Sequence, residues 1–313
     1  MELVRALRIV AFGEGMIEIA GRVGAPCVIG YGGDVLNVAI ALARLGFAPA
    51  FLTALGVDPW SDELAAAWGE EGIDPSLVAR HPTRAPGLYG VRTDAKGERS
   101  FTYWRDASAA RAFFELTDCE ALMGCAAEAD LLFLSGITLS LYGPAERRRI
   151  GGLAERVRAR GGTVAFDPNY RPAGWESARA ASNAFAAFAS QVDIALPTAA
   201  DERLLHGEDD TAEAVLARWR NAGAREVAVK LGSEGAMVWS AGGQHHVPAE
   251  EVTPVDTTGA GDAFDAGYLA ARLAGRPPPE AARFGASLAG ETIRHPGAIP
   301  PRDAVAQFTL AEL

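Results

Sequence analysis

The chain has few cysteines and histidines, and neither type forms a metal-binding pattern. Its three cysteines, Cys27, Cys119 and Cys125, lack the close spacing of zinc ligands. We therefore expect free thiols in a reducing compartment rather than a disulfide framework or a zinc site. His245 and His246 adjoin in a stretch that is typical of a loop or an edge strand, where solvated side chains are expected.

Long apolar runs and an excess of positive charge are also absent. No apolar run approaches the length of a membrane span, and the start of the chain, MELVRALRIVAFGEG, carries acids and glycines where a signal peptide needs apolar residues. The formal net charge is -11, which argues against nucleic acid or an anionic membrane as a partner. We expect a cytoplasmic protein whose 313 residues, 49% of them hydrophobic, bury a substantial core.

From about Ala129 onward, short apolar runs alternate with helical patterns, which predicts an α/β fold with a mostly parallel sheet covered by helices. Strands are expected at 131–136, 163–167 and 192–197, a helix at 144–160, and a hairpin at 226–240. Ligands bind beyond the carboxyl ends of such strands. Polar residues follow these ends at Ser135, 167–171 and 198–202.

The N-terminal part has a different pattern. A buried strand is expected at 7–13 and helices at 35–45 and 61–71. Segments near 14–33 and 86–106 alternate apolar and polar residues and contain glycine, proline and charge, as half-exposed antiparallel strands do. We predict that they form a small sheet beside the main body. The stretch RPPPE at 276–280 is expected to be a loop.

The stretch VDTTGAGDAFDAGYLAARL, at 255–273, combines a glycine turn, an acid and the start of a helix. Gly259, Ala260 and Gly261 let the backbone approach a ligand, and the free amides of a helix start can hold an anion such as a phosphate. An acid at such a site needs another task, and accepting a proton from an attacking hydroxyl would explain Asp262. Taken alone, the same pattern also fits an Asp that caps its own helix.

The run DTTGAGD resembles the C-terminal motif DTxGAGD of the ribokinase-like (PfkB) carbohydrate kinases. The resemblance implies a single domain over 1–313, with a three-layer αβα fold, a mostly parallel sheet and a small β-sheet lid. It also implies ATP and Mg²⁺, with Asp262 as catalytic base and the amides of Gly259, Ala260 and Gly261 as the anion hole. A requirement for a monovalent cation such as K⁺ is left open.

Other stretches resemble one branch of the family, the kinases of 2-keto-3-deoxygluconate. They are YGGDVLN at 31–37, PGLYGV, GERSFTYWRD at 97–106 and DPNYRP at 167–172. Arginine suits a substrate carboxylate because it donates two parallel hydrogen bonds. An ordinary turn followed by a helix that Asp34 caps, and a solvated strand face, would also explain these residues. The sugar-acid ligands that the resemblance implies are Gly33, Asn37, Tyr89, Tyr103, Arg105 and Arg171.

The resemblance also implies a nucleotide side, made of Asn169, Arg171, Lys230, Gly232, Ser233, Gly235, Asp256 and Thr257. Two features depart from the family pattern. The motif N-x-x-E, which is linked to magnesium through water, is replaced by 198–201 without its Asn, leaving Asp201 or Glu202 as the acid. Near the C-terminus, His295 or no side chain takes the place of an Asp that contacts the sugar acid.

These features predict transfer of the ATP γ-phosphoryl group to the terminal hydroxyl of 2-keto-3-deoxygluconate. Kinases of fructose, ribose or a nucleoside with the same fold remain alternatives, and so does a non-catalytic sugar-acid sensor. The sequence leaves open the gluconate and galactonate epimers. Exposed edges of the small sheet favour a homo-oligomer of undetermined size.

Overall fold

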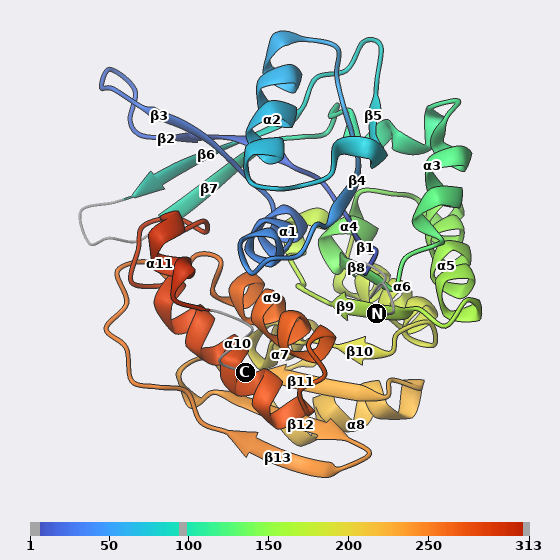
Figure 1. Cartoon of the computed structure of the whole chain (residues 1–313), viewed down its shortest axis with the longest axis vertical. Coiled ribbons are helices and arrows are strands. Elements are labelled where there is room, and N and C mark those ends of the chain that lie inside the picture. Colours follow the sequence, from blue (N-terminus) through green and yellow to red (C-terminus); the bar gives the residue numbers. More distant parts are fainter. Residues whose placement is uncertain (1–6, 94–98, 309–313) are drawn as a thin grey trace, which may run out of the picture.

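The computed structural model describes residues 7–93 and 99–308. Two sheets organise this part of the chain (Figure 1). The main sheet has the strand order β13-β12-β11-β10-β9-β8-β1-β4-β5, and it is parallel from β11 to β5. Its strands are β1 (Ile9–Phe12), β4 (Ala50–Leu55), β5 (Val78–Arg80), β8 (Leu131–Ser135), β9 (Thr163–Asp167), β10 (Ile194–Ala195), β11 (Glu226–Lys230), β12 (Ala236–Ser240) and β13 (Gly243–Val247). The antiparallel pair β11 and β12 is the hairpin that the sequence predicts, and the two adjacent histidines lie on the edge strand β13.

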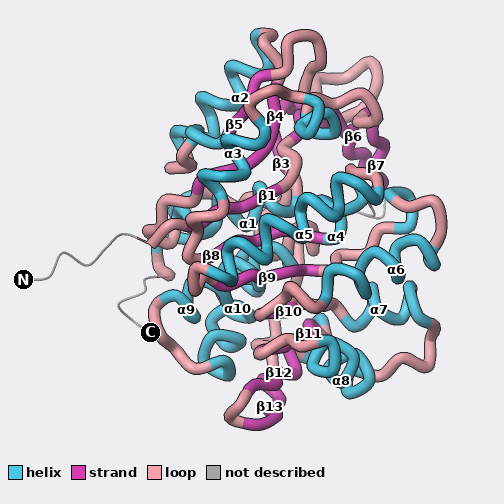
Figure 2. The backbone as a smooth tube through the Cα atoms, turned by 90° about the vertical axis from the view of Figure 1, so that its right-hand side faces the viewer, coloured by secondary structure: helices cyan, strands magenta, loops and turns pink. Residues whose placement is uncertain are grey.

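Helices cover both faces of the main sheet, which gives the expected three layers (Figure 2). One face is covered by α3 (Cys119–Ala126), α4 (Gly136–Ser140), α5 (Pro144–Ala159), α6 (Ala178–Ala189), α7 (Ala199–His206) and α8 (Ala212–Ala222). The other is covered by α1 (Asp34–Arg44), α2 (Pro59–Glu70), α9 (Ala260–Leu273), α10 (Pro278–Thr292) and α11 (Arg302–Ala306). Among the described residues no helix is both long and apolar enough to cross a membrane.

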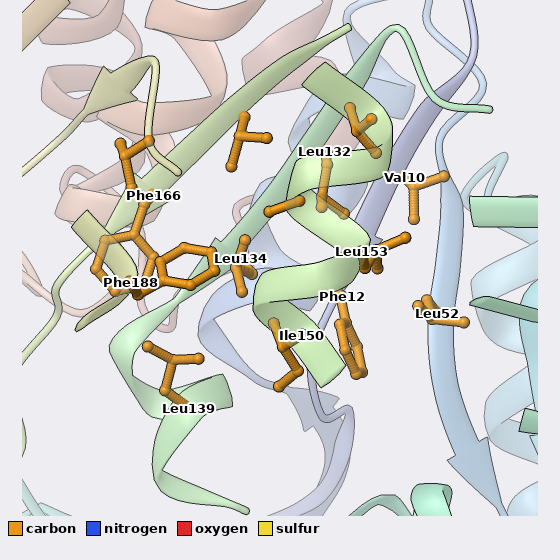
Figure 3. Packing of buried hydrophobic residues seen from close by; sticks show 14 of the residues in the cluster. Val10, Phe12, Leu52, Leu132, Leu134, Leu139, Ile150, Leu153, Phe166 and Phe188 are labelled. Atoms are coloured by element: carbon orange, nitrogen blue, oxygen red, sulfur yellow. The ribbon is translucent and has the colours of Figure 1, made fainter. Parts of the chain in front are cut away.

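The alternation of side chains along each strand divides the core into two clusters. Val10 and Phe12 on β1 pack toward α5, where they meet Ile150 and Leu153 (Figure 3). Ile9 and the rest of the opposite set pack toward α1 and α9. A parallel sheet buried on both faces needs apolar residues at successive positions, and the continuous apolar runs of β1 and β8 meet that need.

The small sheet contains β2 (Met16–Ala20), β3 (Val28–Gly32), β6 (Gly87–Thr93) and β7 (Arg99–Trp104), in the order β3-β2-β6-β7. It projects from one side of the body (Figure 1). The expectation of an antiparallel sheet is wrong at its centre, because β2 and β6 pair in parallel. Alternating side chains indicate exposure on one face but carry no information on strand direction. Gly97 of the predicted stretch 97–106 lies outside the described residues.

Two local expectations also need correction. Asp34 does not cap α1, because it is the first residue of the helix and Gly33 occupies the capping position. Helix α10 begins at Pro278, so the expected loop at 276–280 ends inside a helix. Proline at the first helical position is favourable, because the fixed φ suits the helix and no hydrogen bond is lost there.

Candidate active site

Helix α9 begins in a tight glycine turn. Gly259 has φ 77°, and a Cβ atom there would lie 2.7 Å from the Cα of Ala298, so the position requires glycine. The Ala260 amide donates a long hydrogen bond of 3.3 Å to the Thr257 carbonyl, whereas the amides of Gly259 and Gly261 donate to no other described residue. Two of the three expected amides, together with the positive end of the helix dipole, are available to an anion. We call residues 259–261 the anion turn.

Asp262 lies in the first turn of α9 and directs its carboxylate toward α1. Its Oδ2 accepts a hydrogen bond of 2.7 Å from Nδ2 of Asn37, and the side chain does not cap its own helix. Burial, followed by the negative charge of Asp34, raises the pKa of Asp262 to about 7, although the Asn37 hydrogen bond opposes this change. A carboxylate with a pKa near neutrality is well suited to accept a proton at physiological pH.

The chain after β9 makes a sharp turn that ties Asn169 to α1. Asn169 has φ 35°, the only positive φ at a non-glycine residue in the described chain. Its amide donates to Oδ1 of Asp167 at 3.0 Å, and its Nδ2 donates to Oδ2 of Asp34 at 2.9 Å. Such backbone strain persists only where surrounding contacts hold it. The expected contact of Asn169 with a phosphate would compete with its bond to Asp34.

Lys230 is buried at the end of β11 between two carboxylates. Its Nζ lies 2.8 Å from Oδ2 of Asp167 and 2.8 Å from Oδ1 of Asp265. Burial alone would lower the pKa of Lys230, but the two carboxylates hold it above its ordinary value. Burial also raises the pKa of Asp265. Lys230 therefore has two internal partners, and a nucleotide phosphate would have to share its ammonium group with them, although a Cβ atom on Gly261 would lie only 3.6 Å from its Nζ.

The two acids considered for magnesium lie in different surroundings. Asp201 is 2.9 Å from Nη1 of Arg171, whose side chain is half exposed. Glu202 is buried among Arg218 and Trp219, and burial raises its pKa to about 7. The expectation that Glu202 is a metal ligand is therefore not supported, because successive helical residues face different directions and this one points into the packing of α7 on α8.

One face of the small sheet carries two of the expected sugar ligands, Tyr89 and Tyr103. The Tyr89 hydroxyl donates to Oε2 of Glu18 at 2.6 Å, and the Tyr89 and Tyr103 rings lie 5.9 Å apart. Arg105 follows β7 and pairs with the buried carboxylate of Glu14, which follows β1. Arg105 therefore already has an anionic partner, and a substrate carboxylate would have to share its guanidinium.

Tyr103 connects this face to the main body. Burial raises the pKa of its hydroxyl, while the positive charges of Arg105 and Arg171 oppose that rise and Asp34 adds to it. These three charged side chains, from three separate segments, therefore lie within electrostatic reach of one hydroxyl. Gly33 has φ 153°, and a Cβ atom there would lie 2.2 Å from the Glu14 carbonyl oxygen. Glycine is therefore required at this position, next to Asp34.

The expected nucleotide side is more exposed. Gly232 and Ser233 form an exposed 3-10 turn between β11 and β12. Gly235 ends that turn with φ 94°, and a Cβ atom there would lie 2.1 Å from the Val247 carbonyl oxygen. Thr257 is exposed, whereas the Asp256 carboxylate is occupied by bonds within the protein. His295 lies 3.0 Å from Glu291.

A cavity of about 390 Å³ lies between α10 and the chain that follows β13. Val252, Ser287 and Gly290 are among its lining residues, and none of the predicted site residues is. The candidate active site is therefore identified by its chemistry, which combines a carboxylate, available amides and two guanidinium groups, and not by its volume.

The sequence reasoning did not identify several charged residues of this site. The sequence presents Asp34 as a helix cap, yet its negative charge acts on Asp262, Arg171 and Tyr103. Asp265 follows Asp262 by three residues, and this helical spacing could have placed both acids on one face. Glu14 follows the end of β1, as expected for a residue at the ligand-binding edge of a parallel sheet.

Known proteins resemble this chain along nearly its whole length. Residues 7–304 match the model of the pfkB family carbohydrate kinases. The 2-dehydro-3-deoxygluconokinases of Escherichia coli K12 and Dickeya dadantii are each 40% identical, over 95% of this chain and 98% of theirs. Fructokinase-1 of Oryza sativa is 30% identical over 95% of this chain and 94% of its own.

The fold has close counterparts among solved structures. A PfkB protein from Polaromonas sp. JS666 superposes with a TM-score of 0.83 at 31% identity, over 96% of this chain and 99% of that one. A 2-dehydro-3-deoxygluconokinase from Thermotoga maritima shares the fold, with a TM-score of 0.83 at 24% identity, over 98% and 99% of the two chains. With the family match over residues 7–304, these likenesses identify the chain as a member of the pfkB family of carbohydrate kinases.

Proposed function

We propose that the protein phosphorylates 2-keto-3-deoxygluconate with ATP and yields the 6-phosphate. One observation carries the proposal: Tyr89 lies within electrostatic reach of Asp262, and the adjacent Tyr103 lies within electrostatic reach of two guanidinium groups, those of Arg105 and Arg171. A neutral sugar offers these cations no charge, whereas a sugar acid offers its carboxylate. Two relatives at 40% identity carry the name of this activity.

In the proposed mechanism, Asp262 accepts the proton of the terminal hydroxyl as that oxygen attacks the γ-phosphorus. The bond from the γ-phosphorus to the bridging oxygen breaks, and ADP leaves with the electron pair. The amides of Gly259 and Gly261 donate to the oxygens of the transferred group, on which charge is spread in the transition state. Asn37 supports this step because its hydrogen bond keeps the Asp262 carboxylate oriented.

The sugar would lie between the small sheet and the first turn of α1. Gly33, Asn37, Tyr89 and Tyr103 are proposed to bind its hydroxyls. The Asn37 Oδ1 supports this role, because it is buried and has no described hydrogen-bond partner, so it can accept from a hydroxyl. The small sheet, formed by segments near 14–33 and 86–106, would act as a lid over the sugar and exclude water, which could otherwise accept the phosphoryl group.

The donor set suits Mg²⁺ that arrives with ATP. The described residues contain no group of three carboxylate, imidazole or thiol side chains that could enclose a metal ion. Such a site fits an ion held mainly by phosphates and water, with Asp201 as the acid that would reach it through water. When bound, the ion would screen the charge of the β- and γ-phosphates. Gly232, Ser233 and Gly235 are proposed to line the nucleotide path.

We also propose that the protein forms a homo-oligomer in the cytoplasm through the small sheet. Several large apolar side chains of this sheet are exposed, among them Val28, Ile29 and Trp104. Exposed apolar side chains on a sheet with free edges favour pairing with a second copy. Sedimentation of the wild type and of Trp104→Glu would test this, and a monomeric wild type would contradict it.

A coupled assay of ADP release tests the proposed activity. It should compare 2-keto-3-deoxygluconate, its galactonate epimer, fructose and ribose, because a fructokinase is also a relative at 30% identity. We expect the highest kcat/KM with a keto-deoxy acid, and Arg105→Ala should reduce that preference over fructose. A preference for fructose that Arg105→Ala leaves unchanged would contradict the substrate, and absence of ADP with every sugar would favour a non-catalytic sensor.

A further inference from the structure

The carboxylate of Asp256 joins three separate segments of the chain. Its Oδ1 accepts from the amide and the hydroxyl of Thr258, at 3.1 and 2.7 Å, and its Oδ2 accepts from the Gly297 amide at 2.5 Å. The third segment is the small sheet, because Nη2 of Arg99 lies 2.8 Å from the same Oδ2. The Arg99 and Asp256 side chains are only 20% and 8% exposed, so the ion pair is largely shielded from solvent.

Arg99 belongs to the face of the small sheet that covers the active site. It is the first residue of β7, where the backbone pairs Thr93 with Arg99 and Tyr89 with Tyr103. Side chains two residues apart point to the same side of a strand, so Arg99 shares the face of Tyr103. A position of the sheet that brings Tyr103 over the sugar therefore also brings Arg99 to Asp256.

Asp256 in turn supports the anion turn. Its bonds to Thr258 fix the residue just before Gly259, and its bond to Gly297 holds the segment against which the turn packs, since a Cβ atom on Gly259 would touch Ala298. Without a cation, a carboxylate so close to the turn would repel an incoming phosphate. Arg99 supplies that cation from the small sheet, and its Nη1 also lies 3.4 Å from Oγ1 of Thr258.

We propose that Arg99 is a positioning residue that makes the anion turn competent for phosphoryl transfer only when the small sheet covers the sugar. The inference rests on the proposed function and adds to it a route from sugar binding to phosphate binding. Arg99 acts through Asp256, because its guanidinium is already committed to that carboxylate and to Thr258. Its contribution is to neutralise one charge and to fix the turn.

Kinetics of Arg99→Ala and Arg99→Lys, with Arg92→Ala as control, test this role. Arg92 is exposed on β6 and pairs with Ser100, the neighbour of Arg99, so it faces the other side of the sheet. For Arg99→Ala we expect kcat to fall about 10-fold or more, as for loss of a charged hydrogen bond, with a much smaller rise in the KM of the sugar. Arg99→Lys should recover part of kcat, and Arg92→Ala should resemble the wild type.

The ratio of sugar phosphate formed to ADP released gives a readout that a purely structural role would not change. In the wild type the ratio should be one. In Arg99→Ala it should fall below one, because a small sheet that is no longer held on the turn lets water accept the γ-phosphoryl group and release inorganic phosphate. A ratio of one together with a wild-type kcat in Arg99→Ala would overturn the inference.

Hydrogen exchange separates this inference from the proposed substrate. Amides in 100–104 and the two that donate to Asp256, those of Thr258 and Gly297, should exchange about 10-fold faster in Arg99→Ala than in the wild type and in Arg92→Ala, with no ligand added. Equal exchange at Thr258 and Gly297 would overturn the inference even if the protein phosphorylates the sugar acid. If the wild type prefers fructose, the proposed substrate fails, while the ratio measured with fructose and the exchange rates still decide the role of Arg99.

Discussion

Replacing Asp262 with Asn should reduce catalysis and increase stability, because the proposed base is a carboxylate in unfavourable surroundings. Asparagine has nearly the same shape, and its side-chain oxygen can keep the 2.7 Å hydrogen bond from Asn37. The anion turn should therefore retain its geometry, and the KM for ATP should stay within about threefold of the wild-type value. Loss of a general base typically costs about 10²- to 10⁴-fold in rate, or about 3–5 kcal/mol in the barrier, and we expect kcat to fall in that range.

The effect on stability follows from the pKa of Asp262. Its pKa is raised from 3.8 to about 7, mainly by burial, and this difference corresponds to at most about 4 kcal/mol. Because the folded-state pKa is the higher one, the wild type loses stability as the pH rises from the unfolded-state pKa through about 7. Asn cannot ionise, so the variant avoids that loss. We expect it to be about 1–3 kcal/mol more stable at pH 8, since relaxation and bound water relieve part of the penalty.

Two measurements on the same preparations test these expectations. ADP release under saturating ATP gives kcat, and urea unfolding at several pH values between 4 and 8 gives the free energy of unfolding. Glu208→Gln is a matched control, because it removes an exposed acid between α7 and α8. Turnover within tenfold of the wild type would refute Asp262 as the base. Lost activity without a gain in stability that grows with pH would refute its description as a buried, charge-crowded carboxylate.

Three further predictions concern the surroundings of this residue. Arg171→Ala should raise the KM of the sugar acid about 10- to 100-fold, as loss of a charged hydrogen bond does, and should affect a neutral sugar much less; equal effects on both would contradict its role. The acid limb of kcat/KM should lie near pH 7 and move to lower pH in Asp34→Asn, because removal of this negative charge lowers the pKa of Asp262; an unmoved limb in a pH profile would contradict the coupling. Gly259→Ala should cost about 1–3 kcal/mol in urea unfolding and most of the activity, because φ is 77° and the new Cβ would meet Ala298 at 2.7 Å; a stable, active variant would show that the turn adjusts freely.

The sequence predicts those parts of the fold whose signal lies within a single strand or helix. The continuous apolar runs of β1 and β8 indicate strands buried on both faces, and the glycine turn before α9 indicates a helix start. The parallel pairing of β2 with β6 could not be predicted in this way. It depends on how distant segments meet, and alternation along one strand is the same for either direction of its partner.

The candidate site shows the same limit. The motif around Asp262 indicates its position at a helix start, because the signal is local. The partners of Lys230 could not be inferred, because Asp167 and Asp265 lie on other elements and approach it only in the folded chain. Glu202 could not be separated from Asp201 for the same reason: the side chains that enclose it, such as Arg218, come from the next helix.

The pairing of Met16 with Gly87 has a consequence for how the chain is made. The hairpin of β2 and β3 and that of β6 and β7 can each form locally. The pairing of β2 with β6, however, connects strands that are separated in the sequence by α1, β4 and α2. Closing that loop costs entropy, and folding of the intervening segment reduces this cost. During synthesis, the first hairpin therefore keeps one strand edge unpaired until the second hairpin has been made.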